Sequence, residues 1–235
     1  HFAVDDQQVK MCTHLQGKQS WFLPFNKGWN HGAGNPPNES GIKTDYLWKH
    51  ILTKPGLTDI IENYAQVVEE KDEKGKNKRT KQIFPRYHQL DVVRKILADA
   101  KKRGAGIRYL IQHSAGSGKS NSIAWLAHQL VGLELSGNQI FDTVIVVTDR
   151  RVLDKQIRNT IKQFAQVSAV VGAVTGDSGS KTQQLSEFLN LGKKIVISTI
   201  QTFPHVLDVI DNQHRNKTFA IIIDEAHSSQ GGRTS

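Results

Sequence analysis

Cysteine is almost absent from this chain, in which Cys12 is the only thiol among 235 residues. One thiol forms no intrachain disulfide and builds no cysteine-based zinc site alone. Long hydrophobic runs are missing too, because no apolar stretch approaches the roughly 18 residues needed to span a bilayer. The first residues also lack the basic and then apolar pattern of a secretory signal. We therefore expect a cytoplasmic protein without a membrane partner.

Acidic residues are in short supply relative to basic ones. The sequence has 22 Asp and Glu against 31 Lys and Arg, which gives a net charge of +9. Such an excess favours a polyanionic partner, because each neutralised phosphate releases a condensed counterion. A basic protein that binds no nucleic acid has the same composition, so charge alone leaves both interpretations open.

The first 68 residues are rich in aromatic side chains and irregular in pattern. They surround a stretch of Gly, Pro and Asn at residues 28–41. Within it, GAGNPP at residues 32–37 resembles the start of a dinucleotide fingerprint, but its two prolines and missing third glycine exclude the required helix start. The aromatic rings can stack on bases or pack against a neighbouring domain, and packing is favoured. Residues 1–68 are therefore predicted to be the end of an upstream domain and a connector.

A charged segment follows, reading EEKDEKGKNKRTK at residues 69–81. It contains no apolar side chain whose burial would offset the entropy lost on ordering. Its basic end can touch a phosphate backbone, although a charge run is usually just solvated. Residues 69–82 are predicted to be a linker or an exposed loop.

From residue 83 the sequence alternates between helical and strand patterns. Apolar residues recur at helical spacing from Leu90 to Ala100, and Gly104 after three basic residues predicts the end of that helix. Short apolar runs, typical of strands buried on both faces, lie at residues 107–111, 143–147, 195–197 and 219–223. The spacing leaves room for crossover helices. The pattern predicts an α/β fold over residues 83–235, with a mainly parallel sheet, helices on both faces and ligands beyond the carboxyl ends of the strands.

A glycine-rich loop, HSAGSGKS at residues 113–120, lies between a predicted strand and a predicted helix. Gly116 and Gly118 let backbone N–H groups converge on phosphate oxygens at a helix N-terminus. Lys119 would reach the β- and γ-phosphates of ATP, and the Ser120 hydroxyl would hold Mg²⁺. His113 stands where the strict pattern has Gly, and the alternative is a glycine-rich turn before an ordinary helix. The remaining predicted ATP-binding residues of the loop are Ser114, Ala115 and Ser117.

Two carboxylates follow the apolar run at residues 219–223. Asp224 can hold a hydrated Mg²⁺, while Glu225 polarises the attacking water. With Lys119 they form the predicted catalytic set, and His227 would sense the nucleotide state. The alternative is an acidic cap on the next helix, which the phosphate loop upstream makes less favoured.

The pair of motifs resembles superfamily 2 helicases and translocases, whose second motif is DEAH or a relative. FPRYHQ at residues 84–89 looks like the family's adenine-reading element. The Gln89 amide can pair with the N6/N7 edge of adenine, with Arg86 close to the base. An ordinary helix cap is the alternative interpretation of this stretch.

Post-strand loops grip the nucleic-acid backbone in that family. TDRR at residues 148–151 and STIQT at residues 198–202 match such loops, and hydroxyls and arginines suit phosphate contacts. Helix capping explains part of these loops equally well. The DNA-binding candidates are Arg150, Arg151, Thr199 and Gln201.

The N-terminal sequences narrow the resemblance. VKM at 9–11, FLPFNKG at 22–28, GAGNP at 32–36 and TDYLW at 44–48 are similar to the region between nuclease and motor in the restriction (R, HsdR) subunit of type I restriction-modification enzymes. The resemblance implies a RecA-like first motor lobe of an ATP-driven double-stranded DNA translocase, working with methyltransferase and specificity subunits. It places the nuclease residues upstream of these segments, and no convincing equivalent is found here.

Two alternatives stay open at this point. One is another superfamily 2 motor, such as a repair helicase or a type III restriction subunit. The other is a non-catalytic DNA-binding scaffold derived from an ATPase, against which the joint presence of Lys119, Ser120, Asp224 and Glu225 speaks.

Overall fold

A computed structural model describes residues 1–71, 78–114, 116–148, 151–164, 170–175, 180–202, 214 and 216–224, with backbone only at residues 69–71, 78–79 and 151–156. The chain forms two compact units, His1–Val92 and Val93–Ser235. The division predicted from sequence, at residues 68 and 82, stays a prediction.

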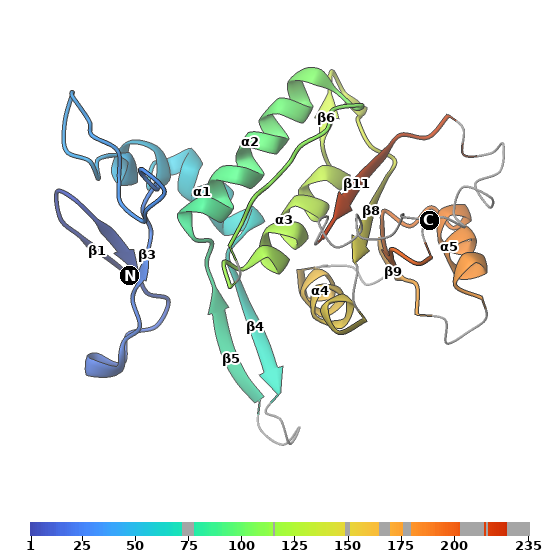
Figure 1. The fold of residues 1–235 in the computed structure, drawn as a ribbon, viewed down its shortest axis with the longest axis horizontal. Helices are drawn as coiled ribbons and strands as arrows, with labels where there is room; N and C mark the ends of the chain where they lie inside the picture. Colours follow the sequence, from blue (N-terminus) through green and yellow to red (C-terminus); the bar gives the residue numbers. More distant parts are fainter. Residues whose placement is uncertain are drawn as a thin grey trace, which may run out of the picture. The chain divides into compact units, whose positions relative to one another are not determined.

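The first unit combines a small antiparallel sheet with short helices (Figure 1). The sheet has the order β1-β2-β3. The helix α1 begins after Thr53, whose side chain accepts a hydrogen bond from Gly56 N–H at 3.2 Å, with a proline in its first turn; both are standard helix-start features. The elements are β1 (Phe2–Val4), β2 (Val9–Met11), the 3₁₀ turn η1 (Gly17–Gln19), β3 (Leu23–Pro24), the π-turn η2 (Leu47–Ile51) and α1 (Lys54–Asn63).

The charged segment is a β-hairpin rather than an irregular linker. The strands β4 (Gln66–Lys71) and β5 (Lys78–Ile83) pair antiparallel, in a register that sets Gln66 opposite Ile83. Composition reports only how much apolar surface a segment can bury, whereas a strand pair also satisfies backbone N–H and C=O groups through its ladder. The base of the hairpin is apolar, since Val68 is only 6% exposed. The described part of this segment is therefore paired strand instead of the loop that its composition predicted, while its role as a linker stays a prediction.

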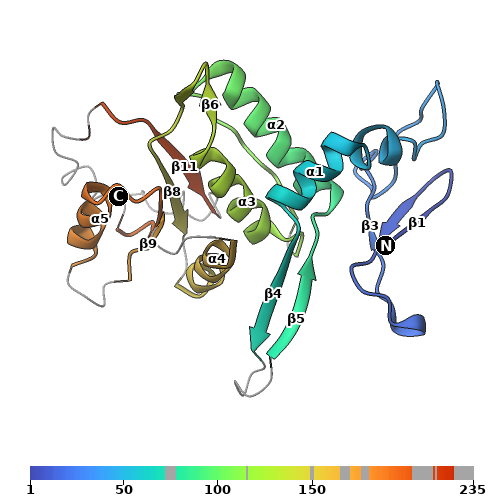
Figure 2. The same ribbon diagram turned by 180° about the vertical axis from the view of Figure 1, so that it is seen from behind.

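The second unit is built on a four-stranded sheet in the order β11-β8-β10-β9, and all of its neighbouring strands run parallel. Figures 1 and 2 show β8 and β11 side by side with their arrowheads toward the same end. This confirms the predicted α/β fold with a parallel sheet. The elements from residue 87 on are α2 (Tyr87–Arg103), α3 (Lys119–Val131), β6 (Glu134–Leu135), β7 (Asn138–Gln139), β8 (Thr143–Thr148), α4 (Arg151–Phe164), β9 (Val171–Ala173), α5 (Lys181–Asn190), β10 (Ile195–Thr199) and β11 (Phe219–Ile223).

Helices cover both faces of this sheet. The helices α3 and α4 contact each other and the sheet, and Trp125 of α3 meets the ring of Phe164 of α4 edge-on at 5.6 Å. On the other face α5 packs its Leu185 and Leu189 with Val196 of β10. The strands β8 and β10 are buried along their whole length, as the apolar runs at residues 143–147 and 195–197 predict.

Residues 107–111 do not form the predicted strand. The described residues of this run have no sheet partner, and Leu110 is 92% exposed. The hydroxyl of Tyr109 instead donates to the Asp99 carboxylate of α2 at 2.8 Å. A short apolar run becomes a strand only when a neighbouring strand is available for pairing, and periodicity cannot report that. The apolar run of β11 does form a strand, but it is not buried on both faces as predicted, because Ile221 and Ile223 are about half exposed, at 49% and 50%.

No described helix has the length and the apolar character needed to cross a membrane.

Candidate functional site

The glycine-rich loop enters α3 through two left-handed residues. Gly116 has φ of 72° and Gly118 has φ of 84°, and α3 starts at Lys119 directly afterwards. A Cβ at Gly116 would meet nothing within 4 Å, so backbone conformation rather than lack of space requires glycine there. The first N–H groups of a helix have no partner within the helix. A helix N-terminus of this kind is a common binding site for anions.

The rest of the loop is partly enclosed. Ser117 is buried, and its N–H donates to the Ser114 carbonyl at 3.3 Å, which closes a tight turn. Lys119 and Ser120 are half-buried in the first turn of α3. His113 does not have positive φ, so its replacement of the expected glycine causes no backbone strain. Ala115 lies outside the described residues.

The acidic motif begins at the carboxyl end of β11. The N–H of Asp224 donates to the carbonyl of Val147 in β8 at 2.9 Å, and Asp224 is only 8% exposed. Thr148 and Thr199 end β8 and β10, so three neighbouring strands finish at one edge. The helix α3 that follows the phosphate loop contacts β8, β10 and β11. The predicted residues Glu225 and His227 lie outside the described residues.

The DNA-binding candidates differ in their surroundings. Gln201 is exposed, whereas Thr199 is 3% exposed and its hydroxyl contacts that of Thr202 at 3.1 Å. Thr199 therefore holds the loop after β10 in shape, and its side chain is not on the surface. Arg151 starts α4 with its side chain outside the description, as is all of Arg150.

The predicted adenine-reading residues form the start of α2. The Gln89 Oε1 accepts the Arg86 N–H at 2.8 Å, which is the backward half of a capping box. This bond caps the helix, and it leaves the amide able to pair with a base because an amide oxygen has a second lone pair. Arg86 Nε is buried and has no hydrogen-bond partner in the described part of the chain. A buried donor without a partner in the protein is consistent with a site that binds a ligand.

These residue types fit a magnesium-bound triphosphate. The loop supplies N–H donors and the Lys119 ammonium group for the phosphates. Ser120 supplies a hydroxyl and Asp224 a carboxylate, and both are oxygen ligands of the kind that Mg²⁺ prefers. In the described residues no three His, Cys, Asp or Glu side chains gather as a metal cluster.

Asp5, near the N-terminus, accepts the Gln7 and Gln8 N–H groups at 2.7 and 2.8 Å, and these bonds lower the pKa of its carboxyl.

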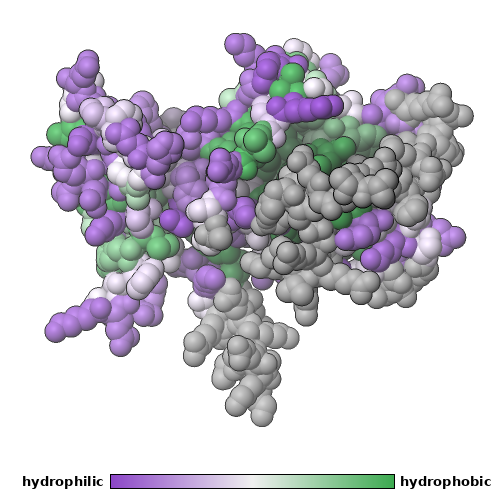
Figure 3. Space-filling view, in the orientation of Figure 1, coloured by the Kyte–Doolittle hydropathy of each residue, from purple (hydrophilic) through white to green (hydrophobic). Residues whose placement is uncertain are grey.

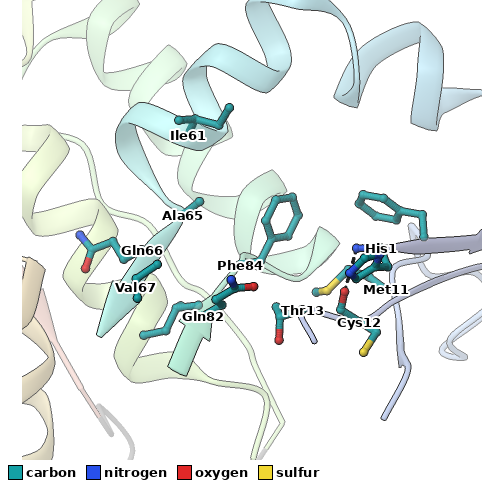
Figure 4. Close-up of a pocket in the computed structure, with 12 residues that line it drawn as sticks. His1, Met11, Cys12, Thr13, Ile61, Ala65, Gln66, Val67, Gln82 and Phe84 are labelled. Carbon is teal, nitrogen blue, oxygen red and sulfur yellow. Dashed lines mark hydrogen bonds between the residues drawn. The ribbon is translucent and has the colours of Figure 1, made fainter. Parts of the chain in front are cut away.

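A cavity of about 290 Å³ lies within the first unit (Figure 4). Its lining is mostly apolar and includes Met11, Cys12, Ile61 and Phe84. None of its lining residues carries a predicted phosphate or magnesium role. On the face of the molecule drawn in Figure 3, hydrophobic residues (green) are exposed among hydrophilic ones (purple). The cavity therefore offers none of the groups predicted to bind the phosphates or Mg²⁺.

Sequence reasoning missed the asparagines that organise the first unit. Asn35 is 4% exposed and its side-chain Nδ2 donates to Asn26 Oδ1 at 2.9 Å. Asn26 lies in FLPFNKG and Asn35 in GAGNP, and a bond between two loop amides leaves no periodic signal in the sequence that could have revealed it.

No curated protein matches this chain. The family model of the SWI2/SNF2 ATPase matches residues 88–235, which include the phosphate loop, the parallel sheet and the acidic motif. Taken with the parallel α/β sheet, this match makes the chain a member of the SWI2/SNF2 ATPase family, a group of superfamily 2 helicase-like ATPases.

Proposed function

We propose that this chain is the first motor lobe of an ATP-driven translocase of double-stranded DNA, in the restriction (R) subunit of a type I restriction-modification enzyme. The observation that carries the proposal is the arrangement around one sheet: α3, which follows the phosphate loop, contacts β11, and the buried Asp224 comes directly after β11. Family membership supports the use of ATP. The net charge of +9 and the N-terminal FLPFNKG and GAGNP sequences support the finer assignment.

Each residue of the phosphate site has a proposed role. Lys119 binds the β- and γ-phosphates, and its charge stabilises the transferring group. Ser120 and Asp224 hold Mg²⁺, which supplies electrostatic stabilisation of the phosphate oxygens when bound. Glu225 accepts a proton from the attacking water and orients it, while His227 couples the nucleotide state to the rest of the motor. The backbone of the loop from Ser114 to Gly118 completes the phosphate grip.

The base end of ATP is assigned to the start of α2. We propose that Gln89 offers a paired donor and acceptor to adenine, and that Arg86 lies next to the base. The orphaned Arg86 Nε is the observation that supports this role. The same pairing is not available to guanine, whose O6 would face the amide oxygen.

The proposed partners are duplex DNA and the methyltransferase and specificity subunits. Arg150, Arg151 and Gln201 would contact the DNA backbone, with Thr199 shaping the second of the two loops. Nuclease activity of the whole subunit is assigned to residues upstream of the segments matched here, because the resemblance to R subunits implies that position.

The test is ATP turnover of the intact protein with and without duplex DNA. DNA should stimulate hydrolysis, and Lys119→Ala and Glu225→Gln should each abolish it while leaving the circular dichroism spectrum unchanged. A removed catalytic group of this kind costs about 10²-fold or more in turnover. Unchanged turnover in either variant would remove the site assignment. ATP hydrolysis that ignores duplex DNA would remove the translocase assignment.

A further inference from the structure

Two side-chain amides, the half-buried Asn26 and the buried Asn35, join the loops of the first unit. Asn26 Oδ1 accepts the N–H of Val9 at 2.8 Å and the Nδ2 of Asn35 at 2.9 Å. Asn26 Nδ2 donates to the carbonyl of Ala33 at 2.8 Å, and Asn35 Oδ1 accepts the N–H of Lys27 at 2.8 Å. We call these bonds the asparagine clamp. A satisfied polar network of this kind specifies one geometry more strictly than apolar packing does.

The clamp fixes the residue between its bonds, Phe25. Phe25 is fully buried, and its N–H donates to the carbonyl of Val9 at 2.8 Å. Its own carbonyl accepts the hydroxyl of Tyr46 at 2.6 Å. Burial raises the pKa of Tyr46, so its hydroxyl remains a donor. Lys27, whose N–H donates to Asn35 in the clamp, also places its ammonium group 4.8 Å from the centroid of the Tyr46 ring.

The rings of Phe25 and Tyr46 contact the start of α2. Tyr87 meets Tyr46 edge-on at 5.2 Å and Phe25 edge-on at 5.8 Å. Phe84 lies 6.4 Å from Phe25 and 5.9 Å from Phe2. The Phe25–Phe84 pair is tilted at 49°, whereas the other three pairs are edge-on, an arrangement that holds aromatic rings in preferred orientations. Figure 4 shows Phe84 between the base of the β4–β5 hairpin and the N-terminal strands.

Tyr87 and Phe84 lie on either side of Arg86 in the sequence. The turn closes on itself, because Gln89 Oε1 accepts the Arg86 N–H and Gln89 is 3% exposed. The orientation of the Gln89 amide therefore depends on the turn at residues 84–89, and that turn is held by the two rings behind it.

We infer that Phe25 and Tyr46, set by the asparagine clamp, are positioning residues for the base-reading turn, and so determine the preference of this ATPase for adenine nucleotides. The inference rests on the proposed role of Gln89. It also gives FLPFNKG and GAGNP a physical purpose, since Asn26 and Asn35 are the polar residues of those two sequences that interlock.

The experiment is a double-mutant cycle on the intact protein. The ratio of kcat/KM for ATP to that for GTP is measured for Tyr46→Phe, Gln89→Ala and the double variant. Tyr46→Phe removes one hydroxyl and keeps the ring, so the ratio should fall about threefold to tenfold, through a higher KM for ATP with kcat preserved. In the Gln89→Ala background, Tyr46→Phe should change the ratio no further, because the residue acts through Gln89.

Two further variants separate positioning from general stability. Asn35→Ala opens the clamp and should lower the ratio as Tyr46→Phe does. Ile60→Val shortens a fully buried side chain of α1 in the same unit and should leave the ratio unchanged. Thermal unfolding is followed for all variants, so that a fall in the ratio is compared with the stability lost.

The outcomes are distinct. An unchanged ratio in Tyr46→Phe and Asn35→Ala, with Lys119→Ala inactive, would overturn the inference and leave the proposed function standing. Equal losses for ATP and GTP, or additive effects in the cycle, would also overturn the inference. Full turnover in Lys119→Ala would overturn the proposed function and this inference together.

Discussion

The backbone N–H of Asp224 donates to the carbonyl of Val147 at 2.9 Å, so the acidic motif starts while its chain is still paired to the neighbouring strand. The position of this carboxylate is therefore set by the β11–β8 ladder rather than by a loop. A site on a paired strand end is more rigid than one on a free loop.

Asp224→Asn should abolish magnesium-dependent turnover with little change in fold. The amide is nearly isosteric with the carboxylate and keeps the backbone bond to Val147, but it lacks the charge that binds Mg²⁺. ATP hydrolysis as a function of magnesium concentration checks this. Wild-type magnesium dependence in Asp224→Asn would show that the carboxylate holds no metal.

Gly116→Ala should weaken ATP hydrolysis through backbone strain. The φ of 72° disfavours any residue with a Cβ by about 1–2 kcal/mol, although the space around the position is open. Gly132→Ala is the control, because Gly132 has φ of −97° and equally open space. Thermal unfolding and the KM for ATP are compared, and equal behaviour of the two variants would contradict the argument.

Gly172→Ala should destabilise the second unit by about 1–3 kcal/mol, the usual cost of overpacking. An added Cβ would lie 2.8 Å from ring atoms of Phe188 on α5. Denaturant unfolding of the single variant and of Gly172→Ala with Phe188→Leu measures this. The smaller side chain should recover part of the loss, and strictly additive effects would argue against the contact.

The stability of the second unit should fall as the pH drops below about 6.5, the ordinary pKa of histidine. Burial of His128 lowers its pKa, although its Nε2–H donates to the Ile161 carbonyl at 2.9 Å. The unfolded chain therefore takes up a proton at a higher pH than the folded chain does. The stabilising difference is complete above the unfolded pKa and is lost as pH falls through the lowered folded value.

The control for this pH effect is His128→Gln, which keeps a donor for Ile161 and removes the titrating ring. Unfolding free energies of wild type and variant are measured between pH 5 and pH 8. The variant should show a shallower slope below about pH 6.5. Identical slopes would assign the pH dependence to other groups.

The binding of duplex DNA should be strongly salt-dependent, and Arg151→Ala should reduce the slope of log K against log salt by about 1. Lys18→Ala in the first unit provides a control charge that has no proposed DNA role. Filter binding or fluorescence anisotropy over a salt series measures the slope. A larger reduction for Lys18→Ala than for Arg151→Ala would place the DNA interface elsewhere.

Much of the site could be located from sequence because its signals are local. The HSAGSGKS string predicted the loop before α3, and the apolar run before Asp224 predicted a strand ending in a carboxylate; both elements are present. Helix spacing and the basic residues before Gly104 predicted the end of α2 at Arg103. Fold class followed from strand–helix alternation, which reflects periods that each segment carries by itself.

The sequence by itself determined the parallel α/β character of the second unit, the ATPase motifs and the turn residues, because each depends on residues close together in the chain. Only the tertiary structure decided which segments became strands. The apolar run at residues 107–111 has no strand partner among the described residues, whereas the described part of the charged segment belongs to the β4–β5 hairpin. The tertiary structure alone revealed that Asn26 and Asn35 bond to each other and hold Phe25 against Tyr87. Pairing between distant residues depends on where the backbone brings them, and no local pattern encodes that.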